Sequence, residues 1–362
     1  MAGSPSEGII MEIKYELTHS PKEKPTGPVA FGTCFTDHMF LMDYAAGEGW
    51  HNARIVPYAP FQIDPACMVL HYAQEVFEGM KAYRGADGVI RLFRPWENFK
   101  RLSRSCERMC IPSIPVEDGI EAVRALVQTE QDWVPHTADA SLYLRPFIFA
   151  TDAHIGVHAS AHYLFAIIAC PVGSYYANGL APVRIMIEED DVRAVRGGTG
   201  FVKCGGNYAA SMRAGARAEA LGCSQVLWLD GVERKYIEEV GAMNVFFRCG
   251  DTVLTPSLSG SILPGITRMS CLDLLHSWGC PAEERRISVE ELIDAARSGC
   301  LTEAFGSGTA AVISPIGELV YHGETFSIGG GAIGSITQKL YDELTGIQWG
   351  RLPDPYGWTL KV

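Results

Sequence analysis

The chain has 362 residues, and 47% of them are hydrophobic, which is enough to fill the cores of two domains of ordinary size. The formal net charge of −12 argues against a nucleic-acid partner, because a phosphate backbone is bound by clustered positive charge; small-molecule chemistry is favoured instead. The longest apolar run, residues 163–173, is far shorter than the roughly 20 residues of a membrane-spanning helix, so no membrane partner is expected.

The cysteine pattern indicates the compartment. The 11 cysteines are odd in number and scattered, and they form no Cys-x-x-Cys pair. No signal peptide is visible in the sequence. These features predict a reduced, cytoplasmic protein.

The first half of the chain alternates between helix and strand patterns. Residues 1–28 mix small and charged residues and are predicted to form an N-terminal tail that is partly disordered. A small α/β domain is predicted over 29–172. Its expected helices cover 71–85, 94–110 and 120–134, and its expected strands cover 89–93, 141–150 and 162–172.

The second half is richer in strand patterns. The run GSYYANGLAP at 173–182 is predicted to be the interdomain linker, because it joins turn formers and aromatic residues between two strands. A large α/β domain is predicted over 183–362, with a larger and partly antiparallel sheet. Its expected strands are 182–187, 224–229, 236–248, 251–256, 301–305 and 310–316, and its expected helices are 207–222, 266–279 and 289–299.

Lys203 is the only charged residue of GGTGFVKCGGNY, residues 197–208. The common explanation is a surface loop, because burying an unpaired ammonium group is costly and lowers its pKa. A desolvated lysine also suits Schiff-base chemistry, in which the lowered pKa makes the amine nucleophilic near neutral pH. Among the other lysines only Lys81, in FEGMKAY, has comparably apolar surroundings.

A lysine that holds pyridoxal phosphate needs a carboxylate for the pyridine nitrogen and a hydrogen bond to the ring hydroxyl. Glu239, in IEEVGAMN, lies in an apolar strand pattern, and the alternation of a strand turns Glu238 to the opposite face. Tyr208 follows Lys203 by five residues and is the candidate for the ring hydroxyl. The alternative for Glu239 is a surface charge on an edge strand.

A phosphate cup is the remaining requirement. In SILPGITR, Gly265 stands at the start of a helical pattern, so the amides of Ile266 and Thr267 are free to bind an anion. The turn GSGT adds the hydroxyl of Thr309, and Arg94 in LFRPW adds a positive charge. Each feature alone has a more ordinary explanation: LPG can be a simple helix start, GSGT a plain turn, and Arg94 a member of a surface ion pair. Together with Lys203 they favour a pyridoxal phosphate site.

Two other motifs are rejected. GGGAIG at 329–334 matches G-x-G-x-x-G, but too little chain follows it for a dinucleotide-binding domain. His154, His158 and His162 are spaced like metal ligands on a helix, but Gly156 interrupts them and no Cys, Asp or Glu is expected to join them. No metal site is expected.

A series of motifs carries a family resemblance. In chain order these are FEGMKAYRG, RLFRPWENFKRL, SLYLRPF, CPVGSYY, KCGGNYAAS, QVLWLDG, EVGAMN, LPGITR and FGSGTAA. They closely resemble the branched-chain amino-acid aminotransferases, which are fold type IV pyridoxal phosphate enzymes, from about Phe31 to the end of the chain.

The resemblance implies an α/β mixed (α+β) fold of type IV with the active site between two domains, and a homodimer in which each site faces the second subunit. It implies that Lys203 forms the Schiff base with pyridoxal 5'-phosphate, that Glu239 meets the pyridine nitrogen, and that Tyr208 meets the ring hydroxyl. The implied phosphate ligands are Arg94, Ile266, Thr267 and Thr309. The implied substrate-binding residues are Phe31, Phe77, Tyr143, Tyr175, Ala242 and Ala310, with Tyr72 and Val157 contributed by the second subunit.

The implied reaction is a reversible ping-pong transfer of the amino group between L-leucine, L-isoleucine or L-valine and 2-oxoglutarate. Aromatic walls suit the aliphatic side chains. Arg145, two residues from Tyr143 on the same strand face, is the candidate that binds the glutamate carboxylate; a structural ion pair is the alternative.

Other functions on this scaffold remain open. An aminodeoxychorismate lyase or a D-amino-acid transaminase would also keep Lys203 and Glu239. A non-enzymatic protein that stores the cofactor would keep the phosphate cup and dispense with the lysine. The pocket motifs EGMKAY, SLYLRP and GGNYAAS favour the branched-chain enzyme.

Overall fold

The protein is described by a computed structural model over residues 11–27, 29–137, 139–173 and 180–362. The chain divides into two compact units. Unit 1 runs to Ala82, continues from Pro95 to Val172 and includes Val362, whereas unit 2 holds Tyr83–Arg94 and Gly173–Lys361. The domain limits expected from the sequence stay predictions, and residues 174–179 of the expected linker lie outside the described residues.

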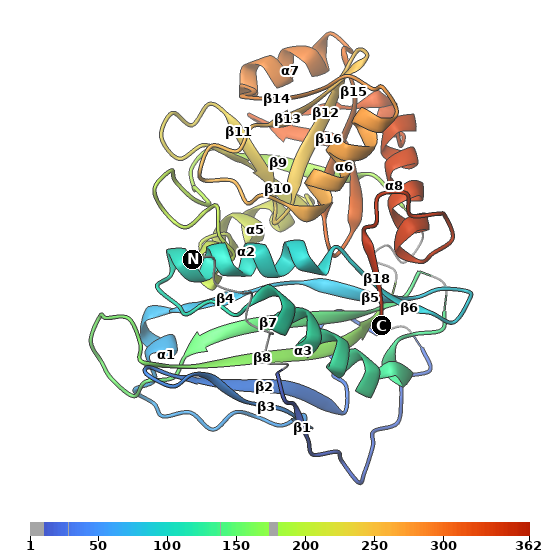
Figure 1. Cartoon of the computed structure of the whole chain (residues 1–362). Coiled ribbons are helices and arrows are strands. Elements are labelled where there is room, and N and C mark those ends of the chain that lie inside the picture. Colours follow the sequence, from blue (N-terminus) through green and yellow to red (C-terminus); the bar gives the residue numbers. More distant parts are fainter. Residues whose placement is uncertain (1–10, 28, 138, 174–179) are drawn as a thin grey trace, which may run out of the picture. The chain divides into compact units, whose positions relative to one another are not determined.

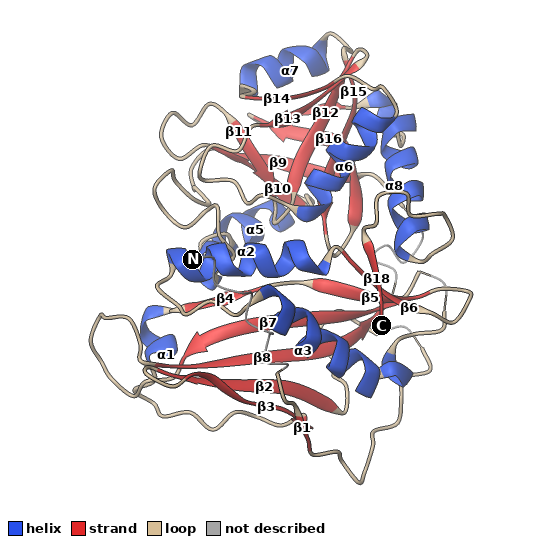
Figure 2. Ribbon diagram, viewed as in Figure 1, coloured by secondary structure: helices blue, strands red, loops and turns tan. Residues whose placement is uncertain are grey.

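Unit 1 is built on a mainly antiparallel sheet (Figures 1 and 2). Its strands run in the order β1-β3-β2-β8-β7-β5, and β4 also pairs with β7. The strands are β1 (Lys14–Tyr15), β2 (His38–Ala45), β3 (Gly49–Pro57), β4 (Glu75–Phe77), β5 (Met80–Arg84), β7 (Ser141–Ala150) and β8 (His162–Val172). The helices are α1 (Met68–Tyr72), α2 (Pro95–Arg108), α3 (Val116–Thr129) and the 3-10 turn η1 (Gln131–Trp133).

The long pair β7 and β8 forms the middle of this sheet. The two strands pair from Ser141 opposite Val172 to Ala150 opposite Tyr163. Most of their side chains are buried, as expected for continuous apolar runs. Both predicted strands are therefore confirmed, and so are the helices predicted over 94–110 and 120–134.

The predicted helix over 71–85 is wrong. Helix α1 ends at Tyr72, and Ala73 follows in the left-handed conformation with φ of 49°. The next residues form β4 and β5, which pair with the two ends of β7. Tertiary pairing with a long apolar strand thus overrides the weak helical spacing of this segment.

Unit 2 contains a mixed sheet in the order β11-β10-β9-β16-β15-β12-β13-β14, with β17 paired to β16. The pairs β9–β10, β9–β16 and β13–β14 are parallel and the others are antiparallel, so the expected partly antiparallel sheet is confirmed. The expectation that this sheet is the larger one is wrong, because each of the two sheets has nine strands among the described residues. The strands are β6 (Ile90–Phe93), β9 (Val183–Glu188), β10 (Gln225–Leu229), β11 (Ile237–Val240), β12 (Asn244–Cys249), β13 (Thr252–Pro256), β14 (Ala282–Arg285), β15 (Leu301–Gly308), β16 (Val312–Tyr321), β17 (Glu324–Ser327) and β18 (Thr359–Lys361).

Helices of unit 2 pack on this sheet. They are α4 (Gly205–Ala209), α5 (Met212–Ala220), α6 (Ile266–Ser277), α7 (Val289–Arg297), η2 (Gly329–Gly331) and α8 (Ser335–Gln348). The apolar side chains of α6 and α8 share a buried core with Phe246 and Phe305, whose rings stack 5.0 Å apart. In the part of the chain that the structure describes, no helix is long and apolar enough to cross a bilayer.

Two predicted elements of unit 2 are each divided. The strand expected over 236–248 breaks at Gly241, whose φ of 56° ends β11, and β12 begins three residues later. The backbones of Val240 and Met243 close this turn with two hydrogen bonds of 2.9 Å. The helix expected over 207–222 separates into α4 and α5. The first break lies between Glu239 and Ala242, and the second follows Tyr208, so both adjoin residues of the expected site.

Candidate active site

Lys203 lies two residues before helix α4, and Tyr208 lies within that helix. The Nζ atom of Lys203 donates a hydrogen bond of 2.5 Å to the hydroxyl of Tyr208 and lies 4.9 Å from the centre of its ring. The side-chain amide of Asn207 donates to the carbonyls of Thr199 and Val202 at 2.8 and 2.9 Å. The glycine-rich loop is thereby tied to α4, which fixes the position of the amine.

Glu239 lies on β11 with only 3% of its surface exposed. Its Oε1 accepts a hydrogen bond of 2.8 Å from the backbone N–H of Leu263, and its Oε2 lies 3.3 Å from the Nε of buried Arg193. Glu238 instead accepts hydrogen bonds from Ser259 and Ser261. The two glutamates therefore make separate sets of contacts, as the alternation of the strand predicts. Glu239 is not the surface charge of the alternative interpretation.

One cavity of unit 2 brings several of the predicted residues together. Tyr208, Glu239 and Ala242 line it, along with Arg193 and Leu263. Lys203 joins this group through its hydrogen bond to Tyr208. An amine, a phenol and a buried carboxylate thus lie around one space.

The start of α6 is held beside this cavity. Leu263 binds Glu239 through its N–H and accepts a hydrogen bond of 2.9 Å from the side-chain amide of Asn244. Gly265 is the N-cap of α6, and a Cβ atom there would lie 2.0 Å from the Oδ1 of Asn244. The backbone amides of Ile266 and Thr267 therefore begin the helix at a fixed place, at the positive end of its dipole.

Arg94 is attached to the same helix. Its guanidinium donates to the hydroxyl of Ser270 at 3.1 Å and to the carboxylate of Asp273 at 2.9 Å. Ser270 lies one turn beyond Thr267. The guanidinium also stacks on Trp358 at 4.9 Å, and its buried Nε has no hydrogen-bond partner among the described residues. Arg94 is thus part of a buried arrangement rather than a surface pair alone.

Thr309 and Ala310 occupy the turn between β15 and β16. Gly306 and Gly308 of β15 lie so close to Met243 that added Cβ atoms would be 2.9 and 3.1 Å from its side chain. Met243 directly follows Ala242. The two turns that carry Ala242 and Ala310 are therefore brought close by the pairing of β12 with β15.

A second cluster lies in unit 1. The rings of Phe31 and Tyr143 are 4.9 Å apart and meet edge to face. Arg145 donates a hydrogen bond of 3.1 Å to the hydroxyl of Tyr143, and its guanidinium stacks on Phe77 at 4.7 Å. Tyr143 and Arg145 thus share one face of β7, as expected. No carboxylate forms a salt bridge with Arg145 in the described part of the chain, which weakens the alternative of a structural ion pair.

Two predicted substrate residues, Tyr72 and Val157, are not brought into these clusters. Tyr72 ends α1, and its ring contacts His71. Val157 is 88% exposed on the loop between β7 and β8. No hydrogen bond or ring contact joins Tyr72 or Val157 to either cluster within the described ranges. Tyr175 lies outside the described residues.

The histidine-rich segment has an acidic neighbour that the sequence analysis left out. Asp152 accepts from His162, with 2.6 Å between the Oδ1 and Nδ1 atoms. The Nδ1 atoms of His154 and His158 are 3.3 Å apart. Among the described residues no group of three or more His, Cys, Asp or Glu is placed to hold a metal ion.

Sequence reasoning missed the residues that hold the site in place. Arg193 contacts Glu239 and Asn244 contacts Leu263 across long stretches of chain, whereas Asn207 contacts the nearby Thr199 and Val202 of the lysine loop. Only Asn244 leaves a signal, as a polar residue within a predicted apolar strand. The other two resemble ordinary loop residues.

Comparisons with known proteins identify the family of the chain. The family model for class IV amino-transferases matches residues 75–319. Branched-chain-amino-acid aminotransferase 2 of Bacillus subtilis (strain 168) is 54% identical over 351 residues, which cover 97% of each chain. The crystal structure of the Escherichia coli branched-chain amino acid aminotransferase is similar with a TM-score of 0.74 and 27% identity, covering 89% of this chain and 98% of that one. The T.th. branched-chain amino acid aminotransferase with pyridoxamine 5'-phosphate has a TM-score of 0.72 and 25% identity, covering 88% and 97%.

Class IV aminotransferases use pyridoxal 5'-phosphate, and the residues of unit 2 fit this cofactor. They supply an amine hydrogen-bonded to a phenol, a buried carboxylate, a helix start and a guanidinium with an unpartnered Nε. The mixed α/β fold of type IV is confirmed by the same comparisons. The chain therefore belongs to the class IV aminotransferases, within the family of branched-chain-amino-acid aminotransferases.

Proposed function

We propose that the chain transfers the amino group of L-leucine, L-isoleucine or L-valine to 2-oxoglutarate, reversibly and in two half-reactions. The observation that carries this proposal is the hydrogen bond between Lys203 and Tyr208 beside buried Glu239. That arrangement supports Schiff-base chemistry. The names of relatives with about half of their residues identical support the substrate class.

Lys203 is the residue that moves the proton. When bound, pyridoxal phosphate withdraws electrons from the carbon that loses its proton. We assign Nζ of Lys203 the transfer of that proton from the substrate α-carbon, as general base and then general acid. The hydroxyl of Tyr208, 2.5 Å from Nζ, orients the amine and is assigned to the ring hydroxyl of the cofactor.

Glu239 is assigned to the pyridine nitrogen. A carboxylate at this position keeps the nitrogen protonated, which the electron withdrawal requires. Arg193 and the N–H of Leu263 contact the two oxygens of Glu239 and hold the carboxylate in its buried position.

The phosphate is assigned to the amides of Ile266 and Thr267, the turn at Thr309 and the guanidinium of Arg94. The helix start supplies oriented N–H groups and a positive dipole end. The unpartnered Nε of Arg94 is a further donor. The backbone amides of Ala242 and Ala310 remain assigned to the substrate carboxylate.

Recognition of the substrate side chain is assigned to the cluster of unit 1. The rings of Phe31, Phe77 and Tyr143 offer apolar surface to an alkyl group. Arg145 lies among them and offers a charged partner to the side-chain carboxylate of glutamate. Tyr175 is also assigned to the pocket wall, as the family resemblance implies.

We also propose a homodimer in the cytoplasm, in which Tyr72 and Val157 reach the site of the second subunit. The loop between β7 and β8 supports an association, because Ile155 and Val157 are 67% and 88% exposed. All 11 cysteines lie within the described residues as free thiols, which suits a reducing compartment.

A transamination assay tests the proposal. L- and D-amino acids are each offered with 2-oxoglutarate to the wild type and to Lys203→Ala, and glutamate formation is measured. We expect turnover with L-leucine, L-isoleucine and L-valine only, and none in the variant. Aminodeoxychorismate is offered in a separate assay. Release of pyruvate from it, or turnover with D-amino acids in the first assay, would assign the chain to one of the alternative enzymes.

A further inference from the structure

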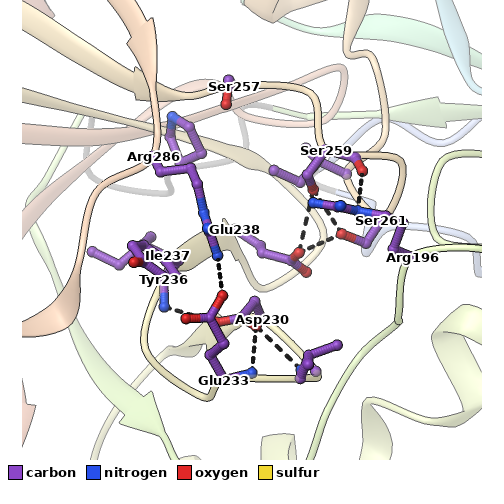
Figure 3. Close-up of a pocket in the computed structure, with 14 residues that line it drawn as sticks. Arg196, Asp230, Glu233, Tyr236, Ile237, Glu238, Ser257, Ser259, Ser261 and Arg286 are labelled. Atoms are coloured by element: carbon purple, nitrogen blue, oxygen red, sulfur yellow. Dashed lines mark hydrogen bonds and ion pairs between the residues drawn. The ribbon is translucent and has the colours of Figure 1, made fainter.

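Unit 2 contains a second cavity, of about 200 Å³, beside Glu238. It is lined by the loop after β10 (230–233), by Tyr236 and the first two residues of β11, and by the end of β13 and the segment that follows it (256–262), together with Arg196 and Arg286 (Figure 3). None of these residues has a role in the proposed reaction. Its volume suits a molecule smaller than a typical drug.

Glu238 is the least satisfied group of this lining. Only 5% of its surface is exposed. Its Oε1 accepts from the hydroxyls of Ser259 and Ser261, but its buried Oε2 has no hydrogen-bond partner among the described residues. The carboxylate is directed toward Ser259 and Ser261 in the lining of the cavity (Figure 3). A buried carboxylate oxygen without a partner is costly, so it marks a place for a donor.

The two other carboxylates of the lining are already engaged. Asp230 accepts hydrogen bonds from the backbone N–H groups of Val232, Glu233, Lys235 and Tyr236. Glu233 pairs with Arg286 at 2.7 Å. A metal ion needs several free ligands, and no such group occurs in the described part of the chain. The open acceptor therefore suits an organic ammonium group.

Positive charge and apolar surface complete the cavity. The guanidinium of Arg286 stacks on Tyr236 at 3.4 Å and is about half exposed, and Arg196 donates its Nε to the carbonyl of Ser259 at 3.1 Å. Val232, Ile237, Pro256 and Ile262 supply apolar side chains. An acceptor for an ammonium group, guanidinium groups for a carboxylate and apolar walls are the elements that recognise an amino acid.

We propose that this cavity binds a free aliphatic α-amino acid at a second site, with its ammonium group on Glu238 and its carboxylate on Arg286 and Arg196. The site is separate from the cluster around Lys203 and does not depend on the proposed reaction.

A pH dependence follows from the surroundings of Glu238. Burial raises the pKa of Glu238; the Ser261 hydroxyl and Arg193 oppose this, and the charges of Glu239 and Asp230 add to it. The ammonium group requires the ionised carboxylate. Affinity is therefore low where Glu238 is protonated and rises with pH through its raised pKa, with a proton released on binding.

Calorimetry on the holoenzyme tests the site. The protein is first reduced with borohydride, so that the bound amino acid is not consumed, and is then titrated with L-valine, isobutylamine and isobutyrate. We expect saturable binding of L-valine that weakens roughly 10- to 100-fold in Glu238→Gln, since a charged hydrogen bond is lost. The matched control is Glu291→Gln, an exposed glutamate paired with Arg285 outside the cavity, and it should bind normally.

A second variant tests the contact with the carboxylate of the ligand separately from the contact with its ammonium group. Arg286→Met should weaken L-valine severalfold but leave isobutylamine almost unchanged, because the amine has no carboxylate. Equal affinity for L-valine in wild type and Glu238→Gln, or an affinity that does not rise with pH, would refute the site. Because the site around Lys203 also takes L-valine, the second site is identified by the difference between wild type and Glu238→Gln, measured at equal cofactor content and with Glu291→Gln as the folded control. A negative result for this site would not contradict the proposed transamination, which is tested by its own assay.

Discussion

At the scale of single residues, Glu239 has two neighbours that hold its charge and position. The N–H of Leu263 and the guanidinium of Arg193 each contact one oxygen of the carboxylate. Lys203 and Tyr208 lie on a separate segment of the chain, at α4, and are bound to each other. The role of Glu239 can therefore be separated from that of the amine by substitution.

Glu239→Gln keeps the shape of the side chain and removes its charge. We expect the cofactor to remain bound, and the rate of the first half-reaction with L-leucine to fall by roughly 100-fold or more, because the pyridine nitrogen is no longer held protonated. Single-turnover absorbance measurements give this rate, with Glu291→Gln as the control. Unchanged turnover would mean that another group protonates the ring.

Arg145 is expected to bind glutamate and 2-oxoglutarate through its charge, whereas L-leucine offers it no side-chain carboxylate. Arg145→Met keeps similar bulk and removes the charge, so kcat/KM for glutamate and 2-oxoglutarate should fall roughly 30- to 150-fold, as expected for a charge-assisted pair. The half-reaction with L-leucine should change severalfold at most. The half-reactions must be measured separately. An equal loss for both substrates would indicate that Arg145 supports the Tyr143 cluster structurally.

At the scale of secondary-structure elements, two helix starts depend on contacts with distant strands. Helix α6 begins at Ile266, with its N-cap Gly265 against Asn244 of β12. Helix α8 begins at Ser335, and the carboxylate of Glu303 on β15 accepts from the N–H groups of Ile336 and Thr337 at 3.2 and 2.8 Å. The start of α6 is assigned to binding the phosphate of the cofactor. The start of α8 contributes to the stability of unit 2.

Gly265→Ala tests the α6 start. A Cβ atom would lie 2.0 Å from the Oδ1 of Asn244, so the helix start must move and the affinity for pyridoxal phosphate should fall at least tenfold. Gly215→Ala in α5 is the control, because nothing lies within 4 Å of its added Cβ; it should stabilise the fold by about 0.5 to 1 kcal/mol. Cofactor release is followed by fluorescence. Normal affinity in Gly265→Ala would exclude the α6 amides as phosphate ligands.

Glu303 makes the free energy of unfolding of unit 2 depend on pH. Burial acts to raise the pKa of Glu303, but the N–H and hydroxyl of Thr337, Arg248 and the N–H of Ile336 outweigh it, so the net pKa is lowered. This stabilisation is fully present above the unfolded pKa, near 4.5, and is lost as pH falls through the lowered folded value.

Glu303→Gln should therefore lower the free energy of unfolding by about 1 to 3 kcal/mol at pH 7 and by much less at low pH. Urea unfolding of wild type and variant at pH 7 and at pH 3 to 4 measures the difference. The same loss at both pH values would show that hydrogen-bond geometry, and not charge, is what matters at this helix start.

At the scale of the whole molecule, the proposed dimer makes a prediction about mixed subunits. Lys203→Ala and Tyr72→Ala should each be inactive alone, because one lacks the amine and the other lacks a residue of the neighbouring site. In hybrid dimers one of the two sites has both residues. Equal mixing should restore roughly a quarter of wild-type activity.

Subunit exchange is verified independently, by mass spectrometry of intact dimers. Exchange without any recovery of activity would mean that each chain completes its own site. A monomer by light scattering would refute the dimer itself.

The residues assigned to the chemistry of this protein can be predicted from the amino-acid sequence by itself. Lys203 and Tyr208 are five residues apart, so a short loop and one turn of helix are enough to bring them together. Glu239 and Glu238 are separated by the alternation of a single strand, and the start of α6 is visible in LPGITR. Each of these relations is local, and local geometry follows from spacing and residue type.

The contacts that hold those groups in place appear only in the folded chain. Arg193 reaches Glu239, Asn244 fixes the loop before α6, and Glu303 caps α8, all across long stretches of chain. The segment 71–85 contains two strands because β7 offers paired hydrogen bonds, and no helical pattern within the segment could report this. Pairing between distant segments depends on which surfaces meet when the chain folds, and single-residue patterns do not contain that information.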